Sequence, residues 1–562
     1  MQTPWARQTK TPHLISHHQA MQHTHGKRLR PGAKLSLALG LALTVPSLLQ
    51  AGTSCHPGDA RDPLASKDPT RAASLNGEWD LKGICPGRPE TASPPKAPAV
   101  AAEAPLVEKN YKPRINYLGP SASFRLDELT HRSLWEEGHP WSLKRAWDLP
   151  TWISLTFEER VRYESYATPW IKDTTQGQYG IPIQSVVWFK AHPTEDFRLE
   201  IQFWDARQYG SADPNKINTT MVNVLNLEQV FAGWVDHNLW NQGIDSESKL
   251  GQMQMAVGSN RLIGIVPFKS TQFQYVGFQN RLRSETQGWE LLTFANTPVE
   301  MLPSSASALA QNTWVWNRPI TDAVFAGAFL DKSLSPWDHF EFYFYYLHEG
   351  MAANLSPTLY TPGFRVFRQP RKGELDFEIE TIGQTGQKRV NSQAPILSVG
   401  SIMQHVQAGY TFDAPWTPRF LLQWDYASSH FDSLFPSTVS EFGPDGILAL
   451  FARNNINTPG YRLFLSPSPD ITLYAANRFW WLADGKSTEG WSGASLVDTS
   501  GQAGNYVGQT WELNGRWDAH ENLAVQVGWQ VLMKGNFADY APGAPTNLGN
   551  VNYWYVESLV RF

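Results

Sequence analysis

The sequence predicts an all-β fold, a transmembrane antiparallel β-barrel of roughly 16–18 strands preceded by a signal peptide and a periplasmic lead-in segment. Three observations support this prediction. Apolar and polar residues alternate from Thr151 onward, a secretory signal precedes them, and the chain ends on an aromatic residue, Phe562. The expected organisation is an N-terminal extension with signal peptide over 1–51, a lead-in with a Pro/Ala-rich linker over 52–149 and the barrel over 150–562.

The alternation is the main observation, because side chains of a strand point to opposite faces in turn. It is clearest in the segments 151–165 (TWISLTFEERVRYES), 197–204 (FRLEIQFW), 339–347 (HFEFYFYYL), 373–381 (GELDFEIET), 419–426 (RFLLQWDY) and 523–531 (LAVQVGWQV). Short turns such as 466–470 and 518–522 alternate with longer polar stretches such as 483–505 and 534–550. This alternation of turns and loops is typical of outer-membrane barrels. A soluble β-sandwich is the alternative, and it would have shorter strands with more aliphatic faces.

The last twelve residues, 551–562 (VNYWYVESLVRF), are predicted to form the strand that closes the barrel. Trp554, Val556, Val560 and Phe562 share one face of this strand. Closure would remove the exposed edges that a sheet of so many strands otherwise has.

The segment 27–51 is predicted to be the secretory signal. It has a basic start, a short apolar run over 35–49 and a plausible cleavage site at Ala51. The polar, His-rich residues 1–20 do not look like a signal, which favours Met21 over Met1 as the start of translation. The two cysteines, Cys55 and Cys85, follow the signal and are expected to form a disulfide in the oxidising periplasm. The alternative is a lipid-modified Cys55, but the preceding residues lack the usual Leu.

The composition narrows the class of protein further. Charged residues make up 18 % of the 562-residue chain and aromatic residues 13 %, with 24 Trp. Aromatic girdles at two membrane interfaces would account for this composition, and so would a carbohydrate-binding protein. The net charge of −5 gives no reason to expect nucleic acid as a partner. Beyond the N-terminal segment no apolar run is long enough for a transmembrane helix, which excludes a helical-bundle membrane protein.

Arginines are expected to line the inner face of the barrel and to bind an anionic substrate. Arg offers a planar, two-pronged donor that matches a carboxylate. The candidates are Arg160, Arg162, Arg198, Arg419 and Arg516, which point inward by simple alternation, and Arg365, Arg462 and Arg478, which lie in short or mixed runs. Acidic residues share this face, among them Asp376, Glu378, Glu380 and Asp425. The alternative is therefore that the arginines form salt-bridge ladders that stiffen the barrel wall.

Four segments of the chain, 360–386, 418–437, 446–482 and 506–535, resemble the alginate-export family of bacterial outer-membrane β-barrel proteins. The resemblance implies a location in the bacterial outer membrane, in contact with its lipid, and passive export of an anionic polysaccharide, an alginate-like polyuronate or a related polyanion. A periplasmic export scaffold is a further partner that the resemblance suggests. The sequence departs from the family at 257–264 (VGSNRLIG), where only Arg261 supplies a cation.

Two other functions remain open. A general porin, or one for small anionic solutes such as organic acids, would have the same fold. An outer-membrane enzyme acting on glycan or lipid would need catalytic groups. Glu378 and Glu380 are neighbouring acids of the kind glycosidases use, but no nucleophile motif accompanies the histidines of the mature chain. No catalytic residue, metal site or cofactor is therefore expected.

Overall fold

The computed structural model describes residues 142–562 apart from 267, 351–355, 390–392, 438 and 445. The signal peptide, the Cys55–Cys85 pair and the Pro/Ala-rich linker lie outside the described residues, and the division of the chain at residue 150 stays a prediction. The described part of the chain begins with the short helix α2 (Leu143–Ala146), which Ser142 caps by accepting a hydrogen bond from the backbone N–H of Arg145.

Strands make up most of the described chain. They are β1 Ile153–Tyr166, β2 Gln178–Thr194, β3 Phe197–Tyr209, β4 Asn223–Asp236, β5 Asp245–Met253, β6 Tyr275–Ser284, β7 Trp289–Glu300, β8 Arg318–Pro319, β9 Ala323–Ser333, β10 Asp338–Glu349, β11 Thr358–Arg368, β12 Leu375–Lys388, β13 Leu397–Thr411, β14 Arg419–Ala427, β15 Ile456–Ser468, β16 Ile471–Trp481, β17 Tyr506–His520, β18 Leu523–Lys534 and β19 Val551–Arg561. The short helices α3 Ala306–Ala310, α4 Val439–Phe442 and α5 Asn536–Tyr540, and the 3-10 turns Pro214–Lys216, Leu239–Asn241 and Ser492–Ala494, lie in the connections. No helix of the described residues is long and apolar enough to cross a membrane.

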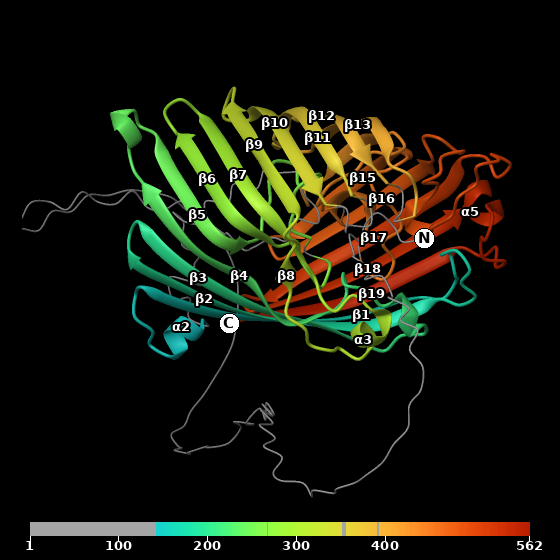
Figure 1. The fold of residues 1–562 in the computed structure, drawn as a ribbon, viewed down its shortest axis with the longest axis horizontal. Coiled ribbons are helices and arrows are strands. Elements are labelled where there is room, and N and C mark those ends of the chain that lie inside the picture. Colours follow the sequence, from blue (N-terminus) through green and yellow to red (C-terminus); the bar gives the residue numbers. More distant parts are fainter. Residues whose placement is uncertain (1–141, 267, 351–355, 390–392, 438, 445) are drawn as a thin grey trace, which may run out of the picture. The chain divides into compact units, whose positions relative to one another are not determined.

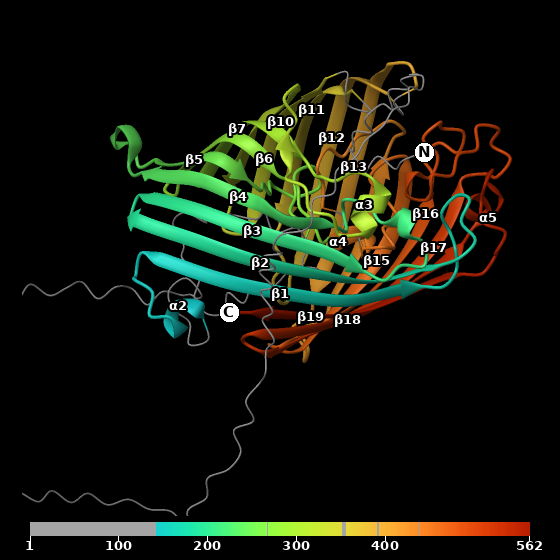
Figure 2. The ribbon, with the colours of Figure 1, turned by 60° about the horizontal axis from the view of Figure 1, so that its bottom comes forward.

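The strands close into a barrel. Each pairs antiparallel with its neighbour in sequence, and β19 pairs with β1 (Figures 1 and 2). The two-residue β8 pairs only with the end of β7, and β7 continues the ring through β9, so 18 of the 19 strands form the wall. Phe157 and Phe562 exchange two backbone hydrogen bonds of 2.8 and 2.9 Å, so the seam extends to the last residue. The predicted fold and the closing role of the last strand are confirmed.

Side chains alternate between the two faces of the wall, as the period of two requires. In β10, Phe342 is 50 % exposed and Phe344 44 % exposed, whereas Glu341, Tyr343 and Tyr345 between and beside them are buried. Most of the other strands repeat this order, so the outer face is largely an apolar belt suited to lipid, interrupted by a polar group at Glu159, Ser185 and Asp205. The inner face carries most of the polar and charged residues.

Glycines on the inner face make room for large side chains of the next strand. A Cβ at Gly363 of β11 would overlap the ring of Tyr343 on β10, and a Cβ at Gly528 of β18 would overlap the ring of Tyr555 on β19. The Tyr343 hydroxyl can then reach across to Glu380 and donate a hydrogen bond of 2.6 Å.

Short turns and long loops alternate along the chain, as expected. The turns 195–196, 469–470 and 521–522 lie at one end of the barrel, together with Phe562, and the long connections 254–274, 428–455 and 482–505 begin at the other end. Periplasmic turns of outer-membrane barrels are short and external loops are long, which gives the orientation.

The inside of the barrel holds a hydrophobic core, which the alternation alone does not predict. Apolar residues of the three long connections pack with the inner face of the wall, including Ile263, Phe435, Phe451 and Trp491. Ile263 and Phe435 form a parallel bridge between the first two connections, and Phe451 stacks on Trp480 of β16 with ring centroids 3.6 Å apart. The stretch 483–505 reads as polar by composition, yet its Trp491, Ala494 and Leu496 are buried. These connections therefore enter the lumen instead of lying on the outer rim.

Candidate functional site

The eight arginines predicted to line the pore are all on the inner face. Arg160, Arg162, Arg198, Arg365, Arg419, Arg462 and Arg478 are buried, and Arg516 is partly exposed near the short-turn end. They come from nonadjacent parts of the wall, because β1 and β3 carry the first three and β11 to β17 carry the rest. Their role in substrate binding stays a prediction.

Most of these arginines contact carboxylates of the wall, on an adjacent strand, on the next strand but one or on their own strand. Arg365 donates hydrogen bonds of 3.0 Å to Glu341 and 2.8 Å to Glu378, so it joins β10, β11 and β12. Arg419 of β14 bonds Asp376 of β12 at 3.0 Å. The salt-bridge ladder that the sequence left as an alternative is therefore present in the wall. Such buried pairs satisfy guanidinium groups that would otherwise be costly to keep out of water.

Other arginines hold the long connections inside the barrel. Arg160 and Arg162 of β1 each donate a hydrogen bond of 2.8 Å to a backbone carbonyl of the connection 254–274, those of Lys269 and Phe268. Trp204 of β3 does the same for the carbonyl of Ser270 at 2.7 Å. The inner face of β1 and β3 is thus bound to one of the loops that fill the lumen.

Arg261 links this loop to the opposite wall. Its guanidinium bonds Glu378 at 2.5 Å, also bonds Glu380, and contacts both carboxylate oxygens of Glu441 at 3.1 Å through Nε. The segment 257–264 departs from the family pattern, but its one cation lies fully inside the barrel, 1 % exposed. Arg261 therefore belongs to the lumen site.

Glu441 and Arg453 belong to the same cluster, and sequence reasoning missed both. They lie in the connection 428–455, which has no alternation to reveal where a side chain points. Burial and the neighbouring charge of Arg261 lower the pKa of the Arg453 guanidinium to about 9. A sequence signal did exist, because the apolar run 447–452 (ILALFA) in a long loop indicates a segment that must be buried.

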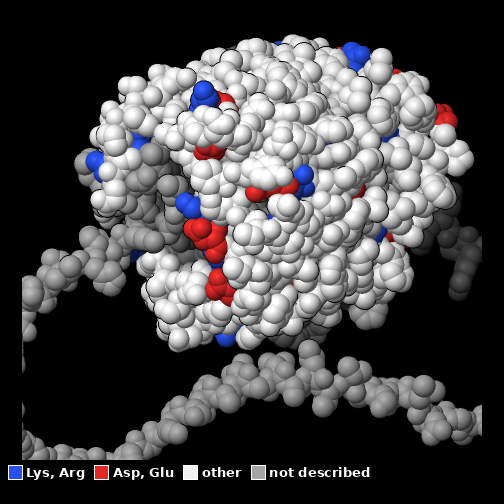
Figure 3. Space-filling model, turned by 90° about the vertical axis from the view of Figure 1, so that its right-hand side faces the viewer, with Lys and Arg blue, Asp and Glu red and all other residues white. Residues whose placement is uncertain are grey.

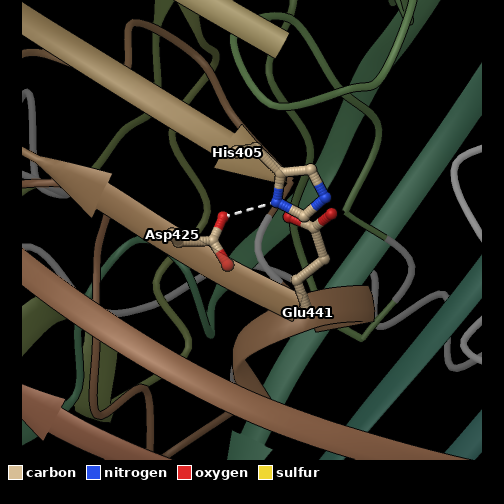
Figure 4. Close-up of side chains that lie close together, drawn as sticks. All are labelled: His405, Asp425 and Glu441. Atoms are coloured by element: carbon tan, nitrogen blue, oxygen red, sulfur yellow. Dashed lines mark hydrogen bonds and ion pairs between the residues drawn. The ribbon is translucent and has the colours of Figure 1, made fainter. Parts of the chain in front are cut away.

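One group of side chains has the residue types of a metal site. His405 of β13, Asp425 of β14 and Glu441 lie within 4.8 Å of one another by their ligand atoms, and Figure 4 shows the two carboxylates directed toward the imidazole. His405 Nδ1 lies 2.8 Å from Asp425 Oδ1. Arg478 also bonds Asp425, and Arg261 and Arg453 bond Glu441. The guanidinium groups already neutralise these carboxylates, so the arrangement fits an ion-pair cluster better than a cation site.

A second cluster ties two long connections together. Glu489 forms an ion pair of 3.0 Å with Lys388 at the end of β12, and it accepts hydrogen bonds from the backbone N–H of His430 at 2.8 Å and the side chain of Asn454 at 2.6 Å. Burial by itself raises the pKa of Glu489, but His430 and the charge of Lys388 outweigh burial and hold this pKa at about 2.

The surface at the α5 end of the barrel has few charges. Figure 3 shows this end as mainly uncharged, with a few small groups of basic and acidic side chains among the described residues. Most of the arginines discussed above are buried inside the barrel, so the concentrated charge of the protein lies in the lumen.

One known protein family matches most of the barrel. The family model described as "Alginate export" matches residues 151–552. Comparison with curated proteins finds no match. Among solved structures, the chain is similar to OccAB1 of Acinetobacter baumannii, with 10 % identity, 73 % of this chain and 96 % of that chain covered and a TM-score of 0.49. It is also similar to OccD3 (OpdP) of Pseudomonas aeruginosa, with 10 % identity, coverage of 73 % and 91 %, and a TM-score of 0.47.

The family match covers almost the whole barrel, from just before β1 to the start of β19. A closed barrel with an apolar outer belt is the architecture of a bacterial outer-membrane protein of the porin type. The chain therefore belongs to the alginate export family of outer-membrane β-barrels.

Proposed function

We propose that this outer-membrane porin exports an anionic polysaccharide, an alginate-like polyuronate or a related polyanion, by passive passage and without a cofactor. The observation that carries the proposal is the set of eight arginines on the inner face, joined by Arg261 and Arg453 of the connections inside the barrel. A polyuronate has one carboxylate per sugar, and guanidinium groups bind carboxylates with two parallel hydrogen bonds.

The acids paired with these arginines are compatible with transport. An anion that enters the lumen can exchange with one wall carboxylate at a time. Each new contact then replaces an existing ion pair, so the net binding free energy of the anion stays small. Passage through a pore requires such weak, repeated binding, since a tightly bound polymer would not leave.

A porin for small organic acids is the second candidate, and the filled lumen favours it. The core formed by the connections 254–274, 428–455 and 482–505 occupies space that a polymer would need. Passage of a polymer then requires these connections to move, whereas a small acid needs a narrower path. A glycan-cleaving enzyme has less support, because Glu378 and Glu380 are bound to arginines rather than open to a substrate.

The test is single-channel current of the refolded protein in a planar lipid bilayer, with oligouronate or a neutral dextran of similar size added. We expect an anion-preferring current that oligouronate blocks and dextran does not. Arg419→Gln should weaken the block, because it removes an inner-face guanidinium. Arg371→Gln is the matched control, since Arg371 lies in the turn between β11 and β12, half-exposed beside Glu374.

Each outcome bears on one candidate. Block by monomeric uronate without any effect of the oligomer would favour the small-acid porin. A current indifferent to both polymers and to uronate would refute anion specificity and leave a general porin. A correctly folded barrel without any current would contradict passive transport.

A further inference from the structure

Four guanidinium groups converge on one residue, Glu441, inside the barrel. Its carboxylate contacts Arg261 and Arg453, and its backbone carbonyl accepts hydrogen bonds from Arg462 and from Arg478, the latter at 2.9 Å. Arg462 and Arg478 belong to the wall strands β15 and β16, whereas Arg261 and Arg453 belong to the connections 254–274 and 428–455. We call these four arginines the arginine cage.

The residue in the cage is not part of the wall. Glu441 lies in α4, within the connection 428–455, so its carboxylate reaches the cage only while this connection is folded into the lumen. The wall acids Glu378 and Asp425 have fixed positions in β12 and β14. Glu441 is therefore the acid of this cluster that can leave without any disruption of the barrel.

The partners of the four arginines show what its departure would change. Arg261 would keep its contacts to Glu378 and Glu380, and Arg478 would keep Asp425. Among the described residues, Glu441 is the carboxylate that forms an ion pair with Arg453. A buried guanidinium without a counter-charge is unfavourable. When Glu441 leaves, binding of another carboxylate at the same place is therefore strongly favoured.

We infer that the arginine cage is a carboxylate-binding site for the transported anion, and that Glu441 occupies it as an internal ligand which keeps the connection 428–455 in the lumen. A carboxylate of a uronate or of a small organic acid replaces the Glu441 side chain, keeps the arginines paired and releases the connection. Binding of the anion thereby moves the connection and opens the path through which the anion passes. This inference rests on the proposed anion transport and adds how that transport is controlled.

The connection is also held by the hydrogen bonds of His430 and Asn454 to Glu489, by apolar packing and by backbone hydrogen bonds. Phe442 packs edge-on against Trp480, and the backbone of Phe435 pairs with Leu262 and Gly264 of the neighbouring connection. These contacts do not depend on an anion, so we expect partial opening and not complete release of the connection. A coupling of this kind typically changes an equilibrium by about 5–150-fold.

The test compares wild type, Glu441→Gln and Glu228→Gln in planar bilayers, with glucuronate as ligand and glucose as neutral control. Glu228 is the matched control, because it is a buried acid of β4 whose described partners are the amides of Gln254 and Gln274 at 3.0 and 2.5 Å. Without ligand, Glu441→Gln should raise the open fraction about tenfold over wild type. Glucuronate should raise the open fraction of wild type and of Glu228→Gln, and it should have little further effect on Glu441→Gln.

A second measurement does not depend on a variant. Hydrogen exchange of wild-type peptides covering 446–454 should become faster with glucuronate and stay unchanged with glucose. Anion-selective current with equal open fractions in all three proteins, and exchange unaffected by glucuronate, would overturn the internal-ligand inference and leave the proposed function intact. Current that shows no preference for anions in any of the proteins would refute the proposed function instead.

Discussion

The Glu489 cluster gives a quantitative prediction about the loops inside the barrel. Glu489 of the connection 482–505 binds Lys388, the backbone of His430 and the side chain of Asn454, so it ties two connections to the end of β12. Its pKa falls from 4.5 to about 2 in the folded protein. With 1.36 kcal/mol per pKa unit, this shift corresponds to about 3 kcal/mol in favour of the ionised, folded state.

The sign of the pH dependence follows from the direction of this shift. A carboxyl group whose pKa is depressed on folding stabilises the folded state above its unfolded pKa, and the stabilisation is lost as the pH falls through the folded pKa. The contribution of Glu489 should therefore be complete above about pH 5 and decline progressively between pH 4.5 and 2.

Glu489→Gln removes the charge and keeps the shape of the side chain. We expect peptides from 428–437 and 484–496 to exchange backbone hydrogens about 100-fold faster in the variant at pH 7, which is the rate ratio for about 3 kcal/mol. Hydrogen exchange with mass spectrometry in detergent micelles measures this ratio, and comparison of both proteins at each pH cancels the intrinsic pH dependence of exchange.

The control is Glu374→Gln, which breaks the half-exposed pair with Arg371 at the opposite end of the barrel. Exposed pairs contribute little, so exchange in both connections should be unchanged. Equal exchange of wild type and Glu489→Gln at pH 7 would refute the reasoning. So would a difference between the two proteins that stays constant down to pH 2.

Three further predictions concern the barrel wall, and each is checked by urea unfolding in lipid vesicles followed by tryptophan fluorescence. Gly363→Ala should destabilise the barrel by about 1–3 kcal/mol, because the new Cβ overlaps the Tyr343 ring; a change below experimental error would show that the ring moves freely. Arg365→Ala should cost about 3–5 kcal/mol, because Glu341 then remains buried without its ion pair; wild-type stability would contradict this. Phe344→Arg, on the outer belt, should cost about 2–4 kcal/mol if the site lies near the bilayer midplane, and a neutral effect would place it outside the hydrocarbon region.

The local pattern of the sequence determined the wall of the barrel. A period of two places Arg160 and Arg162 on one face of β1 and Val161 and Tyr163 on the other, and the structure has them so. The same pattern predicts the closing strand that ends at Phe562, because the direction of each side chain in a strand depends only on the local backbone.

The partners of the inner residues were decided by the tertiary structure. Alternation predicts that Arg365 points inward, but its bonds to Glu341 and Glu378 depend on the register of β10, β11 and β12. The sequence also predicts that the wall arginines contact the substrate. In the structure most of them are paired with carboxylates or with carbonyls of the connections.

The alternation of apolar and polar residues could not predict which residues fill the lumen. Arg261, Glu441 and Arg453 lie in long connections without a repeating backbone geometry, so no period relates their positions in sequence to a direction in space. Their meeting point is set by how the connections pack on the finished wall and on one another, through contacts such as that between Arg261 and Glu441, which are 180 positions apart. Strand direction is a local property of the backbone, and a site formed by loops inside a barrel exists only once the barrel has closed.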